Sequence, residues 1–359
     1  MSLALPGRAG RTRPPAGLGL LVLAVLALAA FAAALCLGPV SIAPERLWAV
    51  LRDAMTGTAA PSGYGIRERV VVLDVRLPRA VLGALAGAAT AVSGAILQGV
   101  FRNPLADPGL VGVSPGAALA AVAFIVLAGD LGLMLPGALR PLSLSVAAFA
   151  GGLVTTLLIG RLAMREGYIS VATLLFAGLA LGALASAGTG LLVFLSTEQQ
   201  SREFLFWTLG SLGGATWAKA ALAAPFVLAL LLVMPVIARG LDALALGEAE
   251  AFHLGIRVER LKRIAILAVA GGVGAAVAAC GVIGFVGLVV PHLVRLTLGP
   301  SHRVLLPASA LLGAAVLLLA DVAARMLAAP AELPLGVVTA LIGAPFFLWL
   351  LMRRRGALG

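Results

Sequence analysis

Apolar, nearly uncharged runs follow one another along this 359-residue chain, and they leave little room for anything else. Hydrophobic residues make up 61% of the sequence and charged residues only 11%. A soluble domain of this size could not hide so much apolar surface from water. Because a bilayer core needs about 20 apolar residues per helix, the pattern predicts an all-α polytopic membrane protein with about ten transmembrane helices. No long polar stretch remains for a second domain, so residues 1–359 are expected to form one transmembrane domain.

The spacing of the apolar runs defines the expected spans. Their ranges are 17–37, 70 or 79 to 100, 113–127, 142–162, 171–195, 217–237, 264–283, 285–298, 304–327 and 335–352. Two amphipathic segments, 44–55 and 201–212, are expected to lie at the membrane surface. Similar basic tetrapeptides at 76–79 and 260–263 open the second and the seventh span. An odd number of spans separates them, which suits two inverted five-helix halves, about 17–212 and 216–352.

The chain carries a formal charge of +11, from 26 Lys and Arg against 15 Asp and Glu. In a soluble protein this balance would suggest a nucleic-acid partner. In a membrane protein, basic helix ends set the topology and contact anionic lipid, so we expect membrane lipid and no nucleic acid. With both termini in the cytoplasm, most basic groups fall inside. These are Arg161, Arg165, Arg239, Arg257, Arg260, Lys262, Arg263, Arg295, Arg303 and residues 353–355.

The N-terminal segment resembles a signal peptide. Arg8, Arg11 and Arg13 precede its apolar run. That run is longer than the usual ~7–15 residues of a signal sequence, so we expect a retained first helix.

One segment departs from the positive-inside rule. Between the first two spans, on the outer side, the chain carries six arginines and four acids that offset them only in part. They are Arg46, Arg52, Arg67, Arg69, Arg76 and Arg79, with Glu45, Asp53, Glu68 and Asp74. A basic cluster against the topology rule needs another reason, and binding of a partner is the simplest one.

A turn rich in proline lies between the second and third spans, at residues 101–110. Pro104 and Pro108 fix φ and remove two backbone donors, and Gly109 allows unusual backbone geometry. Pro104 also keeps Asn103 out of helical geometry. A turn that recovers one shape suits a gate or a docking surface, and an ordinary rigid turn is the alternative.

The only long polar stretch on the inner side is the segment 246–260. Residues 249–254 can form one or two helical turns that Gly255 would end. A short helix that projects from a bundle can act as a lever for a partner subunit, although an ordinary loop helix would have the same sequence pattern. We expect this segment to couple the bundle to such a partner through Glu248, Glu250, Ala251, His253, Leu254 and Gly255.

Ionisable residues within the spans are few, and Asp321 with Arg325 is the notable pair. Their i,i+4 spacing places them on one helix face. They could neutralise each other to lower the cost of burial. Alternatively, Arg325 could dock a partner, or Asp321 could carry a proton in a proton-coupled secondary transporter.

No sequence motif for catalysis or metal binding is present. Neither Lys219 nor Lys262 has the neighbours of a Walker A lysine, so ATP would be bound by another subunit. Cys36 and Cys280 are far apart, and the histidines His253, His292 and His302 have no ligand spacing. We therefore expect a transport subunit rather than an enzyme, with no metal site and no cofactor bound by this chain.

After the first span, the chain resembles the permease subunits of type II ABC importers for cobalamin, iron-siderophores and heme (FecCD-type permeases). The resemblance rests on motifs that follow the order of that family. They lie at residues 76–79, 93–98, 102–110, 247–255, 281–295, 302–307, 320–325 and 332–345.

This resemblance implies a homodimer in the bacterial inner membrane, with the transport path between the two copies. Its partners would be two cytoplasmic ATPase subunits that bind ATP and Mg²⁺, and a periplasmic binding protein. The resemblance also implies that Arg76, Arg79 and Arg325 dock acidic residues of the binding protein. A cytoplasmic gate would involve Asn103, Leu105, Ser170 and Val171, although Val171 and Ala172 are apolar where cobalamin permeases are polar.

The substrate is expected to be heme, because the segment 196–212 resembles the heme branch most closely. An apolar path with arginines only at its mouth also suits a flat apolar ligand that carries two carboxylates. The same path would admit an iron-siderophore, and cobalamin is a further alternative within the family.

Overall fold

The computed structural model describes residues 15–40, 42–57, 64–165 and 167–355. Within them, seven helices are long and apolar enough to cross a membrane, and three shorter apolar helices bring the total to ten, as the sequence predicts. The only strands in these ranges form a short hairpin, β1 (Met164–Arg165) with β2 (Tyr168–Ile169). Arg8, Arg11 and Arg13 lie outside the described residues.

The apolar helices occupy the predicted ranges closely. They are α1 (Ala16–Cys36), α4 (Leu77–Val100), α5 (Val113–Leu131), α6 (Ser143–Leu162), α7 (Val171–Leu195), α9 (Trp217–Leu244), α11 (Val258–Cys280), α12 (Val286–Thr297), α13 (His302–Leu327) and α14 (Leu335–Arg355). The short elements are α2 (Pro44–Thr56), α3 (Ile66–Val70), η1 (Val71–Arg76), η2 (Pro108–Val111), η3 (Gly137–Leu142), α8 (Glu198–Thr208) and α10 (Glu248–His253).

Several helices extend beyond their predicted bounds: α5 ends at Leu131 and α9 at Leu244, four and seven residues later than predicted, and two helices begin earlier. The second span continues α3 and η1 without a break, so one helical segment runs from residue 66 to residue 100. α11 begins at Val258 instead of near residue 264, because the charge of Lys262 is neutralised locally by Glu248 and Glu259.

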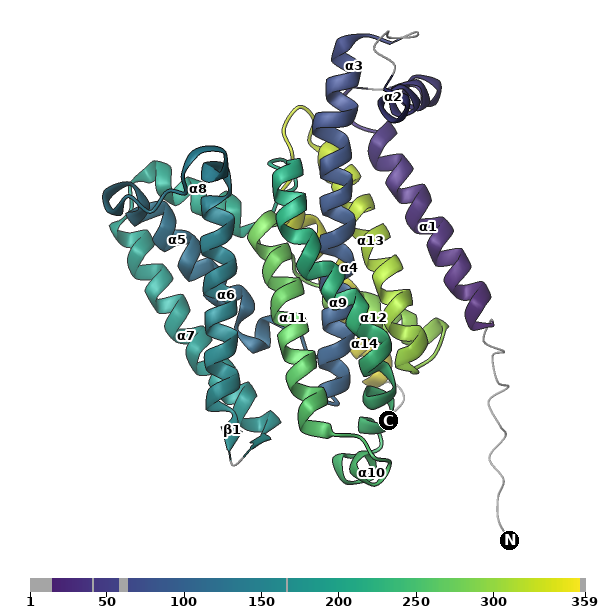
Figure 1. Cartoon of the computed structure of the whole chain (residues 1–359), viewed down its shortest axis with the longest axis vertical. Helices are drawn as coiled ribbons and strands as arrows, with labels where there is room; N and C mark the ends of the chain where they lie inside the picture. The colour runs from purple at the N-terminus through teal and green to yellow at the C-terminus, as the bar shows by residue number, and fades with distance from the viewer. Residues whose placement is uncertain (1–14, 41, 58–63, 166, 356–359) are drawn as a thin grey trace.

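Helix α4 is the centre of the bundle. It packs against α9, α11, α12 and α13, and Figure 1 shows it surrounded by these neighbours. Small residues permit the close approach: a Cβ at Gly87 would overlap the Gly313 carbonyl of α13, and a Cβ at Gly94 would overlap the Gly287 carbonyl of α12. In a bilayer, such backbone contacts are a main source of helix association.

The remaining helices lie to either side of this centre. α5, α6, α7 and α8 form a second group at one edge, and α1 lies at the opposite edge (Figure 1). α7 covers this group with only Leu174, Gly178 and Ala185 buried. The surface helices α2 and α8 lie at one end of the bundle, and α10 and the hairpin lie at the other end (Figure 1).

The contact of α4 with α12 gives a direct test of this packing. Alanine normally stabilises a helix relative to glycine by about 0.5–1 kcal/mol, but overpacking costs about 1–3 kcal/mol. We expect Gly94→Ala to lower the Tm of the purified protein. Gly160→Ala on α6, where a Cβ meets open space, is the matched control and should leave the Tm unchanged or raise it. An equal response of both variants would contradict the assigned packing.

Candidate functional site

An ion cluster joins α4 and α13 at the end of the bundle that carries α2. Arg79, in the first turn of α4, donates from Nε and Nη2 to Asp321 Oδ1 at 3.0 and 2.8 Å. Its Nη1 and Nη2 donate to the two carboxylate oxygens of Glu332 at 2.9 Å. One guanidinium is thus held by two carboxylates, a geometry that is strong and specific.

Arg325 extends this cluster toward α1. Its Nε lies 3.1 Å from Asp321 Oδ2, so the predicted i,i+4 pair is confirmed. Its other nitrogens donate to the carbonyls of Leu37 at 3.1 Å and Ala34 at 3.2 Å. Asp321 therefore forms ion pairs with two guanidinium groups at once.

Arg76 completes the attachment of α1. It donates to the carbonyls of Leu35 at 2.6 Å and Cys36 at 2.9 Å, and it contacts the carbonyl of Val40. The last carbonyls of a helix lack partners within the helix and carry partial negative charge. The end of α1 is thus bonded by two arginines that come from α13 and η1.

The structure places the three predicted docking arginines together, but it also buries them. Arg76, Arg79 and Arg325 are only 4%, 7% and 4% exposed. Glu332 is the accessible member of the cluster, with 37% of its side chain exposed. Hydrogen bonds from Arg79 lower the pKa of Glu332, and partial burial opposes that shift. Glu332 is a site residue that was not predicted from the sequence, although it opens one of the family motifs.

At the opposite end of α4, the proline-rich turn is fixed by its own side chains. Asn103 Oδ1 accepts from the backbone N–H of Leu105 at 2.9 Å, and Asp107 Oδ1 accepts from that of Gly109 at 2.8 Å. Such turns hold a backbone without help from neighbouring elements. Leu105 is 56% exposed, so an apolar side chain projects from a rigid turn.

A groove of about 600 Å³ separates this turn from α7. Asn103 lines it together with Leu175 and Phe176, which lie one turn beyond Ser170 and Val171. Ser170 caps α7 by accepting from the N–H of Thr173 at 3.2 Å. The two predicted gate segments therefore border one groove, and their role as a gate stays a prediction.

The predicted coupling segment forms the projecting helix α10. Gly247 and Gly255 flank it with φ of 134° and 80°, so Gly255 follows the helix end as expected. Ala251 is buried, whereas Phe252 and Leu254 are 71% and 63% exposed. Phe252 was missed by the sequence analysis, and its signal was an aromatic residue within a polar stretch.

A buried lysine connects this helix to the start of α7. Lys262, 1% exposed, donates to Glu248 of α10 at 2.9 Å, to Glu259 at 3.1 Å and to the carbonyl of Ile169 at 3.0 Å. The N–H of Ile169 donates in turn to Glu259 at 2.6 Å. Ile169 directly precedes Ser170, so one ammonium ties the coupling segment to a predicted gate segment.

This bundle has the fold of a type II ABC importer permease. It superposes on a solved metal-chelate type ABC transporter in an inward-facing conformation with a TM-score of 0.78 and 31% identity, over 93% of this chain and 98% of that one. The chain belongs to the FecCD transport family, whose model matches residues 25–353. It is therefore a multi-pass membrane subunit of the ABC importer class, whose members work with ATPase and substrate-binding partners.

Relatives of this chain include permeases named for hemin and permeases named for cobalamin. The hemin transport system permease protein HmuU of Yersinia pestis is 44% identical over 347 residues, 96% of this chain and 98% of that protein. The cobalamin import system permease protein BtuC of Halobacterium salinarum is 47% identical over 298 residues, 82% of this chain and 78% of that protein. The vitamin B12 import system permease protein BtuC of Shigella boydii is 41% identical over 339 residues, 94% and 95% of the two chains.

The ion cluster predicts that replacing Asp321 destabilises the protein more than replacing Glu332 does. Asp321→Asn leaves Arg79 and Arg325 buried without their shared partner, and breaking a buried pair costs about 3–5 kcal/mol. Glu332→Gln removes a partly exposed partner, and such pairs contribute about 0–1 kcal/mol. We therefore expect a much larger loss of Tm in purified Asp321→Asn than in Glu332→Gln.

The acid sensitivity of the two variants provides a second readout. The pKa of Glu332 is lowered in the folded state. The stabilisation of the folded state by the ion pair of Glu332 with Arg79 is therefore present at neutral pH and is lost as the pH falls through that lowered pKa. Glu332→Gln should remove this part of the pH dependence of Tm. Equal losses of stability in both variants at neutral pH would show that Asp321 is not the centre of the cluster.

Proposed function

We propose that this chain is the permease of an ATP-driven heme importer that works as a homodimer. The observation that carries the choice of heme is the surface of α7, which runs from Val171 to Leu195 without a charged residue. Phe176, Leu179 and Phe194 on this helix are 73%, 73% and 84% exposed. In a bilayer such a surface can face lipid or a partner, and we assign it to the transport path because Phe176 and Leu179 line the groove beside the proline-rich turn.

An apolar wall favours a flat porphyrin over a corrin with many amide groups. Each amide that moves from water into such a path would lose its hydrogen bonds to water and find no partner on the apolar wall, which costs free energy. The groove between α7 and the proline-rich turn borders this wall and leads to the proposed inner gate. The similarity to HmuU over nearly the full length of both chains supports the same cargo.

Cobalamin is the second candidate, because two permeases named for it are 47% and 41% identical to this chain. The test is uptake into proteoliposomes that contain the permease and its ATPase, with binding protein and ATP but no ion gradient. We expect heme to accumulate, and cobalamin or a ferric siderophore to accumulate less. Accumulation of cobalamin without heme would make the choice of heme wrong.

The same experiment separates the two transport classes. Uptake that needs a proton gradient and no ATP would favour the secondary transporter with Asp321 as proton carrier. The contacts of Asp321 support a structural role instead, because both of its carboxylate oxygens are engaged by arginines.

The ion cluster around Arg79 is the proposed docking site for an acidic binding protein. Arg79 and Arg325 are balanced by Asp321 and Glu332, and the guanidinium of Arg76, which lies beside that of Arg325 at Gly38, makes the cluster positive overall. A docking carboxylate can take the place of Glu332 without opening the buried contacts of Asp321, because Glu332 is the exposed partner of Arg79. Glu332 would then occupy the docking site in the free permease.

This arrangement predicts that substitutions of Glu332 and of Arg79, which contact each other, change the docking affinity in opposite directions. Glu332→Gln should tighten docking severalfold, because it removes a competing and repelling charge, and it should make docking more sensitive to salt. Arg79→Gln should weaken docking. The measurement is the Kd for the purified binding protein at low and high salt, with Arg140→Gln as an exposed control away from the cluster. Weaker docking of Glu332→Gln, or unchanged docking of Arg79→Gln, would place the docking site elsewhere.

At the other end, α10 is the proposed contact for the ATPase, with Phe252 and Leu254 as its apolar anchors. Lys262 connects this contact to the residues before Ser170. A displacement of α10 by the ATPase would thus reach the start of α7 through one buried ammonium. The exposed Leu105 and the capped start of α7 would form the gate that this movement opens.

Lys262→Met tests this connection. The variant keeps much of the side-chain volume and removes all three hydrogen bonds. Couplings between sites are about 1–3 kcal/mol, so we expect transport per ATP hydrolysed to fall by about tenfold. Assembly with the ATPase should persist, because Phe252 and Leu254 are unchanged.

Lys262→Arg should restore part of the coupling, and Lys219→Met, at the other lysine of the chain, is the matched control. Normal transport per ATP in Lys262→Met would contradict the proposed route.

A further inference from the structure

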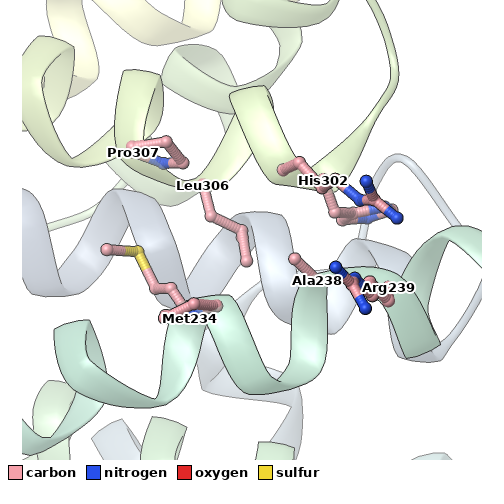
Figure 2. A pocket seen from close by; sticks show the side chains of 8 residues that line it. Met234, Ala238, Arg239, His302, Leu306 and Pro307 are labelled. Atoms are coloured by element: carbon pink, nitrogen blue, oxygen red, sulfur yellow. The ribbon is translucent and has the colours of Figure 1, made fainter.

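A pocket of about 420 Å³ opens between α9 and α13, away from the sites described above. Figure 2 shows that its lining is divided: Met234 and Pro307 lie toward one end, and Arg239 and His302 lie toward the other. Arg303 also lines the pocket. One cavity therefore combines an apolar end with a basic end.

The division follows the axis of the bundle. α9 leads into α10, and Asp242 in its last turn bonds His302, the first residue of α13, so Arg239 and His302 lie nearer α10 than Met234 and Pro307 do. Five residues of helix span about 7.5 Å. The basic groups thus lie near the membrane boundary, and the apolar groups lie more than one helical turn deeper.

The two arginines of the pocket are exposed and lack an acidic partner. In the described ranges, neither Arg239 nor Arg303 forms a hydrogen bond or an ion pair. The nearby carboxylate of Asp242 is engaged by other groups. It accepts from the backbone N–H of His302 at 2.7 Å and from Ser301 at 3.1 Å, and its Oδ1 lies 2.8 Å from Nδ1 of His302, so the free charge of the basic end is that of the two arginines. The positive charge at this end of the pocket is therefore available to an external anion.

We propose that this pocket binds an anionic phospholipid. The phosphate contacts Arg239 and Arg303, and the beginning of an acyl chain occupies the space beside Met234, Leu306 and Pro307. Basic pockets between transmembrane helices at the cytoplasmic side are suited to such headgroups. A zwitterionic lipid would bring its own cation toward the arginines, and a free phosphate would leave the apolar end unused.

The test is native mass spectrometry of the purified full-length permease in detergent. It is titrated with phosphatidylglycerol and, separately, with phosphatidylcholine of the same acyl chains. Each arginine near a membrane surface contributes about 1 kcal/mol toward an anionic lipid, so the preference should fall about fivefold in Arg239→Gln or in Arg303→Gln. The double variant should bind both lipids alike.

Arg161→Gln is the matched control, because it removes one exposed arginine at a helix end outside the pocket, and it should keep the preference. Equal binding of the two lipids by the unaltered protein, or a full preference in the double variant, would overturn the proposal.

A second variant separates a lipid from a free anion. Met234→Trp fills the apolar end and leaves both arginines in place, so it should weaken phosphatidylglycerol binding. Inorganic phosphate at millimolar concentration should not displace the lipid from the unaltered protein. Displacement by phosphate, or unchanged lipid binding in Met234→Trp, would indicate an anion site instead and would contradict the lipid assignment.

Discussion

The shared carboxylate of Asp321 is the interaction on which the end of the bundle that carries α2 depends. Without it, Arg79 and Arg325 would be two buried cations in a low-dielectric environment, a costly state. With it, α4 and α13 are joined directly, and Arg325 can also bond the end of α1. A charged cluster in a membrane protein is thus both a structural joint and a positively charged surface at the proposed entrance.

The opposite end uses the same principle with the charges reversed. There, one buried ammonium, that of Lys262, is held by Glu248 and Glu259. Between the two ion centres, α4 is fixed by glycine contacts that allow backbones to touch. Among the long spans α7 is the least enclosed, and α10 carries the exposed Phe252 and Leu254; the proposed function assigns the path to α7 and the ATPase contact to α10.

Much of this architecture follows from local sequence patterns. Each long apolar run had to become a helix, because only a helix satisfies its own backbone groups in lipid. Gly255 at the end of α10 and the pair of Asp321 with Arg325 were also predictable, since both depend on spacing within one helix. The resemblance to the importer permeases placed the gate and docking residues on their segments, and their roles stay predictions.

The sequence by itself determined that this protein lies in a lipid bilayer, how many spans it has and in which order, and which residues lie at the two ends of the bundle. Only the tertiary structure decided which groups from distant segments meet. Glu332 lies 253 residues from Arg79, and Ile169 lies 93 residues from Lys262, so no periodicity connects them. Such pairs form because a buried charge must find a partner wherever the packed helices bring one, and that choice is made by the bundle as a whole.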